Sequence, residues 1–207
     1  MTRNNPNLLF EQELWKSGIR FIAGLDEAGR GALAGPVAVG AVILPNDSNL
    51  SSTLSGVRDS KQMTPLERES AAPRIKEIAL TWGIGFASSD EIDSDGIVAA
   101  TRLAALRSLE SLSLIPSYLL TDFRLELPQL DISQTALVKG DALCLSIAAA
   151  SVLAKTARDE LMRGLDSTHP GYGLGKHKGY GTPAHRLALK RLGYSPIHRK
   201  SFAFHEL

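Results

Sequence analysis

Residues 20–44 read RFIAGLDEAGRGALAGPVAVGAVIL, two runs of apolar and β-branched residues with a glycine-rich segment between them. Runs of this kind predict two neighbouring strands, here about 20–26 and 36–44, joined by a loop of special conformation. The glycine-rich segment does not open a helix, because a second strand follows it, so it fails the structural test for a dinucleotide-binding motif. Two adjacent acids, Asp26 and Glu27, come directly after the first run.

Helices and strands alternate along the rest of the chain. Asn5-Pro6 and Thr64-Pro65 each combine a capping residue with proline at the first helical position. Apolar spacing and such caps predict helices at about 6–17, 64–81, 96–113, 145–163 and 183–192, and further strands at about 83–88, 118–121 and 136–139. This order predicts an α/β domain built on a mixed sheet, and it leaves the pairing order of the strands open.

The composition is that of an ordinary globular domain. The chain has 207 residues, of which 43% are hydrophobic and 22% charged, so we expect one domain over residues 1–207. It has neither a signal-peptide pattern nor an apolar run of about 18 residues, so we expect a cytoplasmic protein without membrane contact, acting as a monomer. A single cysteine, Cys144, excludes an intrachain disulfide and a cysteine-based zinc site.

The overall charge of +1 hides a strong asymmetry along the chain. Residues 139–207 carry 11 Lys and Arg against 5 Asp and Glu, a net charge of +6, and also hold all 5 histidines. A one-sided basic surface suits a polyanionic partner such as nucleic acid. The alternative is a solvated basic face without a partner. The final part, about 164–207, is expected to be a basic helical segment of the same domain.

Acids follow three of the predicted strands. Asp26 and Glu27 follow the first strand, Asp122 follows YLLT, and Asp141 follows the strand at 136–139. Sites of α/β proteins gather at strand ends, and clustered acids repel one another unless a cation lies among them. Oxygen ligands select Mg²⁺ or Mn²⁺ over zinc, and two such ions can hydrolyse a phosphodiester without a nucleophilic side chain. Any one of these acids can instead be an ordinary loop residue or helix cap, Asp141 above all.

The glycine-rich loop itself is a candidate binding element. Glycines on both sides of an arginine, as in Gly29-Arg30-Gly31, allow the backbone to approach a ligand while the guanidinium reaches a phosphate. On its own, such a triplet is a weak signal and is more often a simple turn than a binding loop.

Four segments together resemble ribonuclease HII. They are the string from Gly24 to Leu44, DSK at 59–61, KGD at 139–141 with the following SIAAASVLAKTARD, and HKGYGTPAHRLALKRLG followed by SPIHRKSF. The resemblance covers most of residues 20–202. It implies an RNase H-like fold, a mixed five-stranded sheet flanked by helices with a C-terminal helical segment. It also implies an endonuclease that hydrolyses the RNA strand of RNA/DNA hybrids and cuts 5′ to ribonucleotides embedded in duplex DNA.

The resemblance also implies roles for individual residues. Asp26, Glu27, Asp122 and Asp141 would bind Mg²⁺ or Mn²⁺ and catalyse hydrolysis that leaves a 3′-hydroxyl and a 5′-phosphate. The GRG loop, Gly29, Arg30 and Gly31, would recognise the 2′-hydroxyl that separates RNA from DNA, together with a neighbouring phosphate. Tyr180 would stack on the adjoining deoxyribose at the RNA-to-DNA junction. The residues expected to contact the nucleic-acid backbone are Ser60, Lys61, Lys155, Lys176, His177 and Lys178, each of which can also be a solvated surface residue.

Some residues leave alternatives open. The family usually has glycine after the third acid, whereas Phe123 follows Asp122 here, and Asp131 is the other candidate for that acid although no strand precedes it. Tyr172 competes with Tyr180 for the stacking role, and the HKGYGT match favours Tyr180. Asp159 is expected in a structural ion pair. The alternative functions are an RNase H-like nuclease without junction preference, a non-catalytic hybrid-binding module, and a small-molecule phosphohydrolase, which would not explain the basic tail.

Overall fold

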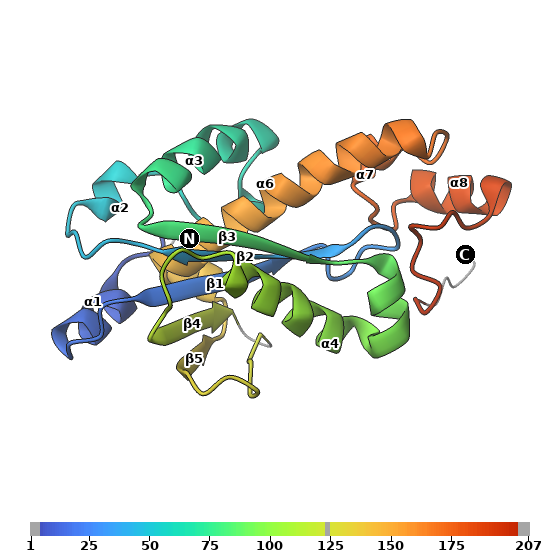
Figure 1. Ribbon diagram of the computed structural model, residues 1–207. Helices are drawn as coiled ribbons and strands as arrows, with labels where there is room; N and C mark the ends of the chain where they lie inside the picture. The colour runs from blue at the N-terminus through green and yellow to red at the C-terminus, as the bar shows by residue number, and fades with distance from the viewer. Residues whose placement is uncertain (1–4, 123–124, 203–207) are drawn as a thin grey trace.

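The computed structural model describes residues 5–122 and 125–202. Its centre is a mixed sheet of five strands in the order β3-β2-β1-β4-β5, as expected for the fold class (Figure 1). β1, β2 and β3 pair antiparallel, and β4 and β5 continue parallel to β1. The strands are β1 (Ile22–Ala28), β2 (Val37–Ile43), β3 (Thr81–Ala87), β4 (Tyr118–Asp122) and β5 (Ser133–Leu137).

Helices cover both faces of this sheet. α3 and α6 lie on one face and α4 lies on the other (Figure 1). All seven residues of β2 are therefore buried, which explains why VAVGAVI lacks the alternation of a half-exposed strand. The helices are α1 (Leu9–Lys16), α2 (Leu50–Thr53), α3 (Pro65–Ile78), α4 (Ser89–Glu110), α5 (Gly140–Leu143), α6 (Leu145–Thr168), α7 (Leu174–His177) and α8 (Pro183–Leu192), with a 3-10 turn η1 at Ser60–Gln62.

Small residues bring α6 close to the centre of the sheet. A Cβ atom at Gly40 of β2 would lie 2.4 Å from the carbonyl oxygen of Ala150, so only glycine allows this approach. The alanines 148–150 present the matching small surface on α6 and are fully buried. As a result, Ser151 of α6 lies beside Asp26 of β1, where its hydroxyl acts on the pKa of that acid.

Two predicted helices begin elsewhere than expected. α1 begins at Leu9 and not at residue 6, because Asn7 pairs with Cys144 as an isolated β-bridge and its Oδ1 accepts a hydrogen bond from the Leu9 amide. α4 begins at Ser89, before the predicted start at 96, with Ser88 as its N-cap. The backbone at Gly96 leaves the helical conformation, with φ of 80°, so the predicted helix corresponds to the part after this kink.

The predicted strand at 136–139 is shifted along the chain. β5 covers Ser133–Leu137, and it cannot include Lys139, whose φ of 58° is left-handed. The remaining strands and α3, α6 and α8 match their predictions within a few residues, although α6 extends to Thr168. No helix in the described parts of the chain has the length and apolar character needed to cross a membrane.

The C-terminal elements pack beyond the end of the sheet. α7, α8 and the tail lie against the distal half of α6 (Figure 1). Met162 of α6, Tyr172, Leu174 and Leu189 form a small separate core with Ala34 from the loop between β1 and β2. This core attaches the basic C-terminal part to the GRG loop.

Candidate active site

The four acids are brought to one region by different elements. Asp26 and Glu27 lie inside β1, since pairing with β2 extends this strand to Ala28. Asp122 is the last residue of β4. Asp141 lies in the short helix α5, not at a strand end. The acids were expected at strand ends. Asp26 and Glu27 lie within the end of β1, because pairing with β2 extends this strand to Ala28, and Asp141 follows β5 only after a turn.

The register of the sheet aligns two of these acids. Leu25 of β1 pairs with Thr121 of β4, so Asp26 and Asp122 follow at neighbouring positions of adjacent parallel strands. The amide of Gly140 donates a hydrogen bond of 2.8 Å to Oδ1 of Asp122. This bond ties the start of α5 to the end of β4 and places Asp141 beside the strand ends.

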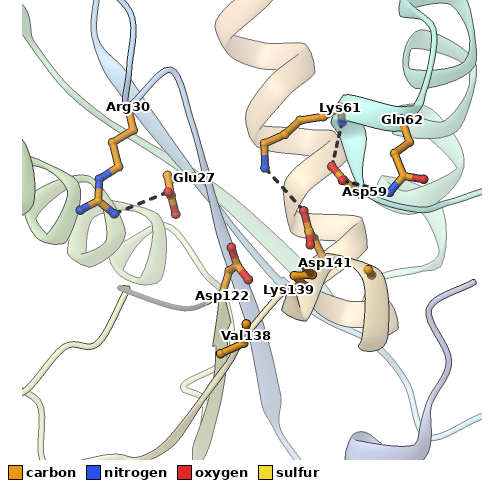
Figure 2. A pocket seen from close by; sticks show the side chains of 10 residues that line it. Glu27, Arg30, Asp59, Lys61, Gln62, Asp122, Val138, Lys139 and Asp141 are labelled. Carbon is orange, nitrogen blue, oxygen red and sulfur yellow. Dashed lines mark hydrogen bonds and ion pairs between the residues drawn. The ribbon is translucent and has the colours of Figure 1, made fainter. Parts of the chain in front are cut away.

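A cavity of about 490 Å³ opens at this edge of the sheet (Figure 2). Its acidic members are Glu27, Asp122, Asp141 and a further residue, Asp59, which was not predicted as a site residue. Asp59 belongs to the DSK segment and caps η1 by accepting a hydrogen bond from the Lys61 amide. The other lining residues are Arg30, Lys61, Gln62, Val138, Lys139 and Ala142.

Burial and mutual repulsion raise the pKa values of Asp26, Glu27 and Asp141. Burial, followed by the charge of Glu27, raises the pKa of Asp26 well above its ordinary value. Burial also raises the pKa of Glu27, with a contribution from Asp122 and opposed by Arg30. Burial and the nearby Asp59 raise the pKa of Asp141 to about 6. Carboxyl groups with raised pKa values in one pocket need positive charge in order to ionise together.

Two cations of the protein supply part of this charge. Arg30 Nη1 lies 3.7 Å from Glu27 Oε1, and Lys61 Nζ lies 3.6 Å from Asp141 Oδ2 (Figure 2). Burial acts to lower the pKa of Lys61, but the charges of Asp26 and Asp141 outweigh it and the pKa is raised. Lys61 therefore remains charged against the acids.

The donor set fits a hard divalent cation in its chemistry. Oδ2 of Asp26 and Oε2 of Glu27 are buried and have no hydrogen-bond partner among the described residues. Unpartnered buried carboxylate oxygens are costly, and an oxygen-only set is what Mg²⁺ and Mn²⁺ prefer. Within residues 5–122 and 125–202, however, no three His, Cys, Asp or Glu side chains are arranged to hold one metal ion.

The GRG loop is held from behind by a buried arginine. Arg199 is 1% exposed, and its guanidinium donates hydrogen bonds of 2.8 Å each to the carbonyl oxygens of Gly29 and Arg30. Because C=O and N–H of a trans peptide point in opposite directions, the amides of Arg30 and Gly31 face away from Arg199. Neither amide has a hydrogen-bond partner in the described part of the chain, and consecutive free amides of this kind can bind an anion.

Tyr180 lies beside α6. Its ring is 5.2 Å from Lys155 Nζ and 5.4 Å from the guanidinium carbon of Arg158. The Lys155 ammonium also pairs with Asp159 at 2.7 Å, which confirms the expected ion pair of that acid. Tyr172 is buried in the C-terminal core, and its hydroxyl donates to the Gly193 carbonyl, so its ring is not free to stack on a nucleotide.

Several expected nucleic-acid contacts are occupied inside the protein. Ser60 is buried and shares a hydrogen bond with Ser151. The ring of His177 contacts the carbonyl of Tyr172, and the Lys178 ammonium contacts the carbonyl of Gly175. These partners are distant in sequence or lie in turns, so no local signal could have predicted them. Lys61 and Lys176 remain exposed.

The alternative third acid, Asp131, lies away from the pocket. Asp131 is exposed and comes just before β5, whereas Asp122 is the last residue of β4. Because β4 and β5 run parallel, the start of one and the end of the other lie toward opposite ends of the sheet. Phe123, where the resemblance expects glycine, lies outside the described residues.

A mixed five-stranded sheet in this order, with acids gathered on and beside its central strands, defines an RNase H-like nuclease domain. The family model of ribonuclease HII matches residues 23–205. The chain therefore belongs to the ribonuclease HII family, and it is an enzyme of the endoribonuclease class.

Relatives and solved structures agree with this placement. Ribonuclease HII of Synechococcus sp. (strain JA-3-3Ab) is 54% identical, covering 96% of this chain and 88% of its own. Ribonuclease HII of Dehalococcoides mccartyi is 49% identical over 96% of this chain and 93% of its own. Among solved structures, the RNase HII in the PCNA:RNase HII complex from Archaeoglobus fulgidus is 25% identical with a TM-score of 0.74, covering 90% of this chain and 97% of that one.

Proposed function

We propose that this endoribonuclease, which acts on RNA paired with DNA, also cuts on the 5′ side of single ribonucleotides embedded in duplex DNA. The observation that carries the proposal is the arrangement of three elements. An acidic pocket contains Glu27, Asp122 and Asp141, and the GRG loop begins two residues after Glu27. Arg158 packs beside Gly29 of that loop and also lies near the ring of Tyr180. This arrangement combines a site for hydrolysis with two elements that can read a sugar.

The acids would serve as the metal ligands. Asp26, Glu27, Asp122 and Asp141 would hold Mg²⁺ or Mn²⁺, and two such ions when bound supply the charge that activates water and stabilises the leaving oxygen. The unpartnered oxygens of Asp26 and Glu27 support this role. Lys61, which faces Asp141, would contact a phosphate oxygen of the substrate. The products would be a 3′-hydroxyl and a 5′-phosphate on the ribonucleotide.

Recognition of the ribonucleotide would use the backbone of the GRG loop. The amides of Arg30 and Gly31 are free to donate to a phosphate or to the 2′-hydroxyl, and these contacts do not depend on the base. Tyr180 would stack on the following deoxyribose and so detect the RNA-to-DNA junction. Cutting at this junction would start the removal of ribonucleotides from DNA. We infer that the chain does this as a monomer in the cytoplasm.

The decisive test uses duplex DNA that carries one ribonucleotide. The purified protein is incubated with this substrate in magnesium, in manganese and in chelator, and the cut is mapped by end-group analysis. We expect cleavage 5′ to the ribonucleotide with either metal and none with chelator. Cleavage of long hybrids alone would indicate a nuclease without junction preference, and binding without cleavage in either metal would indicate a non-catalytic module.

A further inference from the structure

Three histidines pack against one another behind Tyr180. They come from α7 (His177), α8 (His185) and the tail (His198). The rings of His177 and His185 stack at 4.2 Å, and those of His185 and His198 lie 5.2 Å apart. His185 and His198 are buried, with 0% and 1% exposure, so their ring nitrogens need partners inside the protein.

The hydrogen bonds fix the position of each ring proton. Nδ1 of His185 lies 3.0 Å from the carbonyl oxygen of Tyr180, which only accepts, so Nδ1 carries the proton. Nε2 of a neutral His185 is then an acceptor, and Nε2 of His198, 3.0 Å away, must donate to it. Nδ1 of His198 in turn accepts from the amide of Ser195 at 3.1 Å and from its hydroxyl at 2.7 Å. All four ring nitrogens are satisfied only when both rings are neutral.

The surroundings favour the neutral state. The groups that face His198 are the rings of Tyr172, Tyr194 and His185, with His169 and His177 further out. None of the ion pairs among the described residues involves a histidine. Burial lowers the pKa of His185, and burial together with His185 lowers the pKa of His198 to about 4. A proton added to either acceptor nitrogen would place two N–H groups against each other.

The tail connects this relay to the GRG loop. His198 reaches the Tyr180 carbonyl through His185, while the next residue, Arg199, bonds the carbonyls of Gly29 and Arg30. One dipeptide therefore bonds the GRG loop directly and reaches the Tyr180 loop through His185. This link adds to the direct hydrogen bonds from the amides of Leu33 and Ala34 to the Gly179 carbonyl.

We propose that His185 and His198 are positioning residues for junction recognition, a neutral hydrogen-bond relay that fixes the Tyr180 loop relative to the GRG loop. The inference rests on the proposed role of Tyr180. It assigns selectivity for a single embedded ribonucleotide to residues that contact neither the substrate nor the acids. Hydrolysis itself does not depend on the relay, because the acidic pocket contains no member of it.

Two amide variants at position 185 separate positioning from general structure. In His185→Asn, the asparagine amide lies near the place of the imidazole Nδ1, so it keeps the hydrogen bond to the Tyr180 carbonyl and loses the one with His198. In His185→Gln, the glutamine amide lies near the place of Nε2, so it keeps the contact with His198 and loses the one with Tyr180. Each variant breaks the relay at one hydrogen bond, whereas a purely structural role would slow cleavage of the two substrates alike. We measure the cleavage rate at one embedded ribonucleotide divided by the rate on a long RNA/DNA hybrid. Because the relay needs both bonds, His185→Asn and His185→Gln should each lower this ratio about tenfold, the effect of one lost hydrogen bond.

A wild-type ratio in either variant would overturn the relay. If Tyr180→Ala leaves the ratio unchanged, the proposed function itself fails, whereas a change in Tyr180→Ala without one in His185→Gln refutes the relay alone. If neither variant at position 185 folds, the test is ¹⁵N NMR of the histidine side chains in the wild-type protein at pH 7, which reports the protonation state of each ring nitrogen. A neutral His185 protonated at Nδ1 and a neutral His198 protonated at Nε2 are expected, and any other tautomer or a charged ring would overturn the proposal.

Discussion

The Nζ atom of Lys61 lies 3.6 Å from Oδ2 of Asp141 on the acidic pocket, while 68% of the lysine side chain is exposed to solvent. This exposed ammonium is therefore available to a substrate phosphate. We expect Lys61→Gln to weaken binding of an RNA/DNA hybrid about 3- to 10-fold at 0.1 M salt and to reduce the slope of log affinity against log salt by about 1. Fluorescence anisotropy in the Asp26→Asn background, which blocks cleavage, measures both quantities.

The matched control is Lys16→Gln, on α1 and outside the pocket. It should leave both the affinity and the salt slope unchanged. A Lys61→Gln protein with the wild-type slope would show that this ammonium does not contact the nucleic acid.

Asp26 combines function with a cost in stability. Its Oδ2 is buried without a partner and its pKa is raised by burial, so the metal-free protein tolerates this acid poorly. Asp26→Asn should abolish cleavage in magnesium, keep hybrid binding within about 3-fold, and raise the free energy of unfolding by about 1–2 kcal/mol. Denaturant unfolding and single-turnover kinetics check these outcomes.

Asp159→Asn provides the contrast for the stability measurement. Asp159 is also buried, but it pairs with Lys155 at 2.7 Å and with Arg68 at 3.4 Å. Its replacement leaves two cations unpaired and should destabilise the protein by about 3 kcal/mol. Similar stability changes in the two variants would show that Asp26 is not strained by its surroundings.

The sequence predicted the strands well where local pattern and tertiary packing agree. The apolar run of β2 is buried on both faces, so its composition alone defined it. The start of α1 was missed because Asn7 pairs with Cys144, a contact across most of the chain. The kink at Gly96 similarly separates two helical pieces, and only the second has an apolar pattern that is readable in sequence.

The sequence predicted which residues belong to the candidate site better than it predicted their burial and hydrogen-bond partners. The acids and the GRG loop follow from motifs, and the structure brings Glu27, Asp122 and Asp141 to one pocket. The burial of Ser60 and the stacking of the His177 ring on His185 depend on contacts with other elements, which local sequence does not encode. Asp59 could have been found, since it stands in the DSK segment beside Lys61.

Gly29 and Gly31 should respond differently to alanine. A Cβ at Gly29 would lie 1.8 Å from Arg158 Nε, and its φ of +86° disfavours other residues, whereas a Cβ at Gly31 meets nothing within 4 Å. We expect Gly29→Ala to lower the free energy of unfolding by about 3 kcal/mol. Gly31→Ala should fold normally and lose affinity for ribonucleotide-containing DNA. Equal thermal stability of both variants would contradict the packing of Arg158 against this loop.

Tyr180 offers a test of junction recognition. Its ring lies over Lys155 and Arg158 at the edge of the basic C-terminal part. Because stacking on a deoxyribose matters most where RNA meets DNA, Tyr180→Ala should slow cleavage at one embedded ribonucleotide about tenfold more than cleavage of a long hybrid. Tyr180→Phe keeps the ring and should retain the ratio. Equal losses on the two substrates would remove the junction role.

The buried state of His198 predicts a pH dependence of stability. Its pKa is lowered from 6.5 to about 4 in the folded protein by burial and by His185. Between these two pKa values, His198 binds more protons in the unfolded chain than in the folded protein. Its contribution to the free energy of unfolding is therefore fully present above pH 6.5 and is lost as the pH falls toward 4. The free energy of unfolding of the wild type, compared with that of His198→Gln, should therefore fall by about 2 kcal/mol over this range. Asp26 and Asp141, whose pKa values are raised, have the opposite dependence, but they are present in both proteins and cancel in the comparison. The same pH dependence of unfolding free energy in the two proteins from pH 7 to 4 would mean that folding does not lower the pKa of His198.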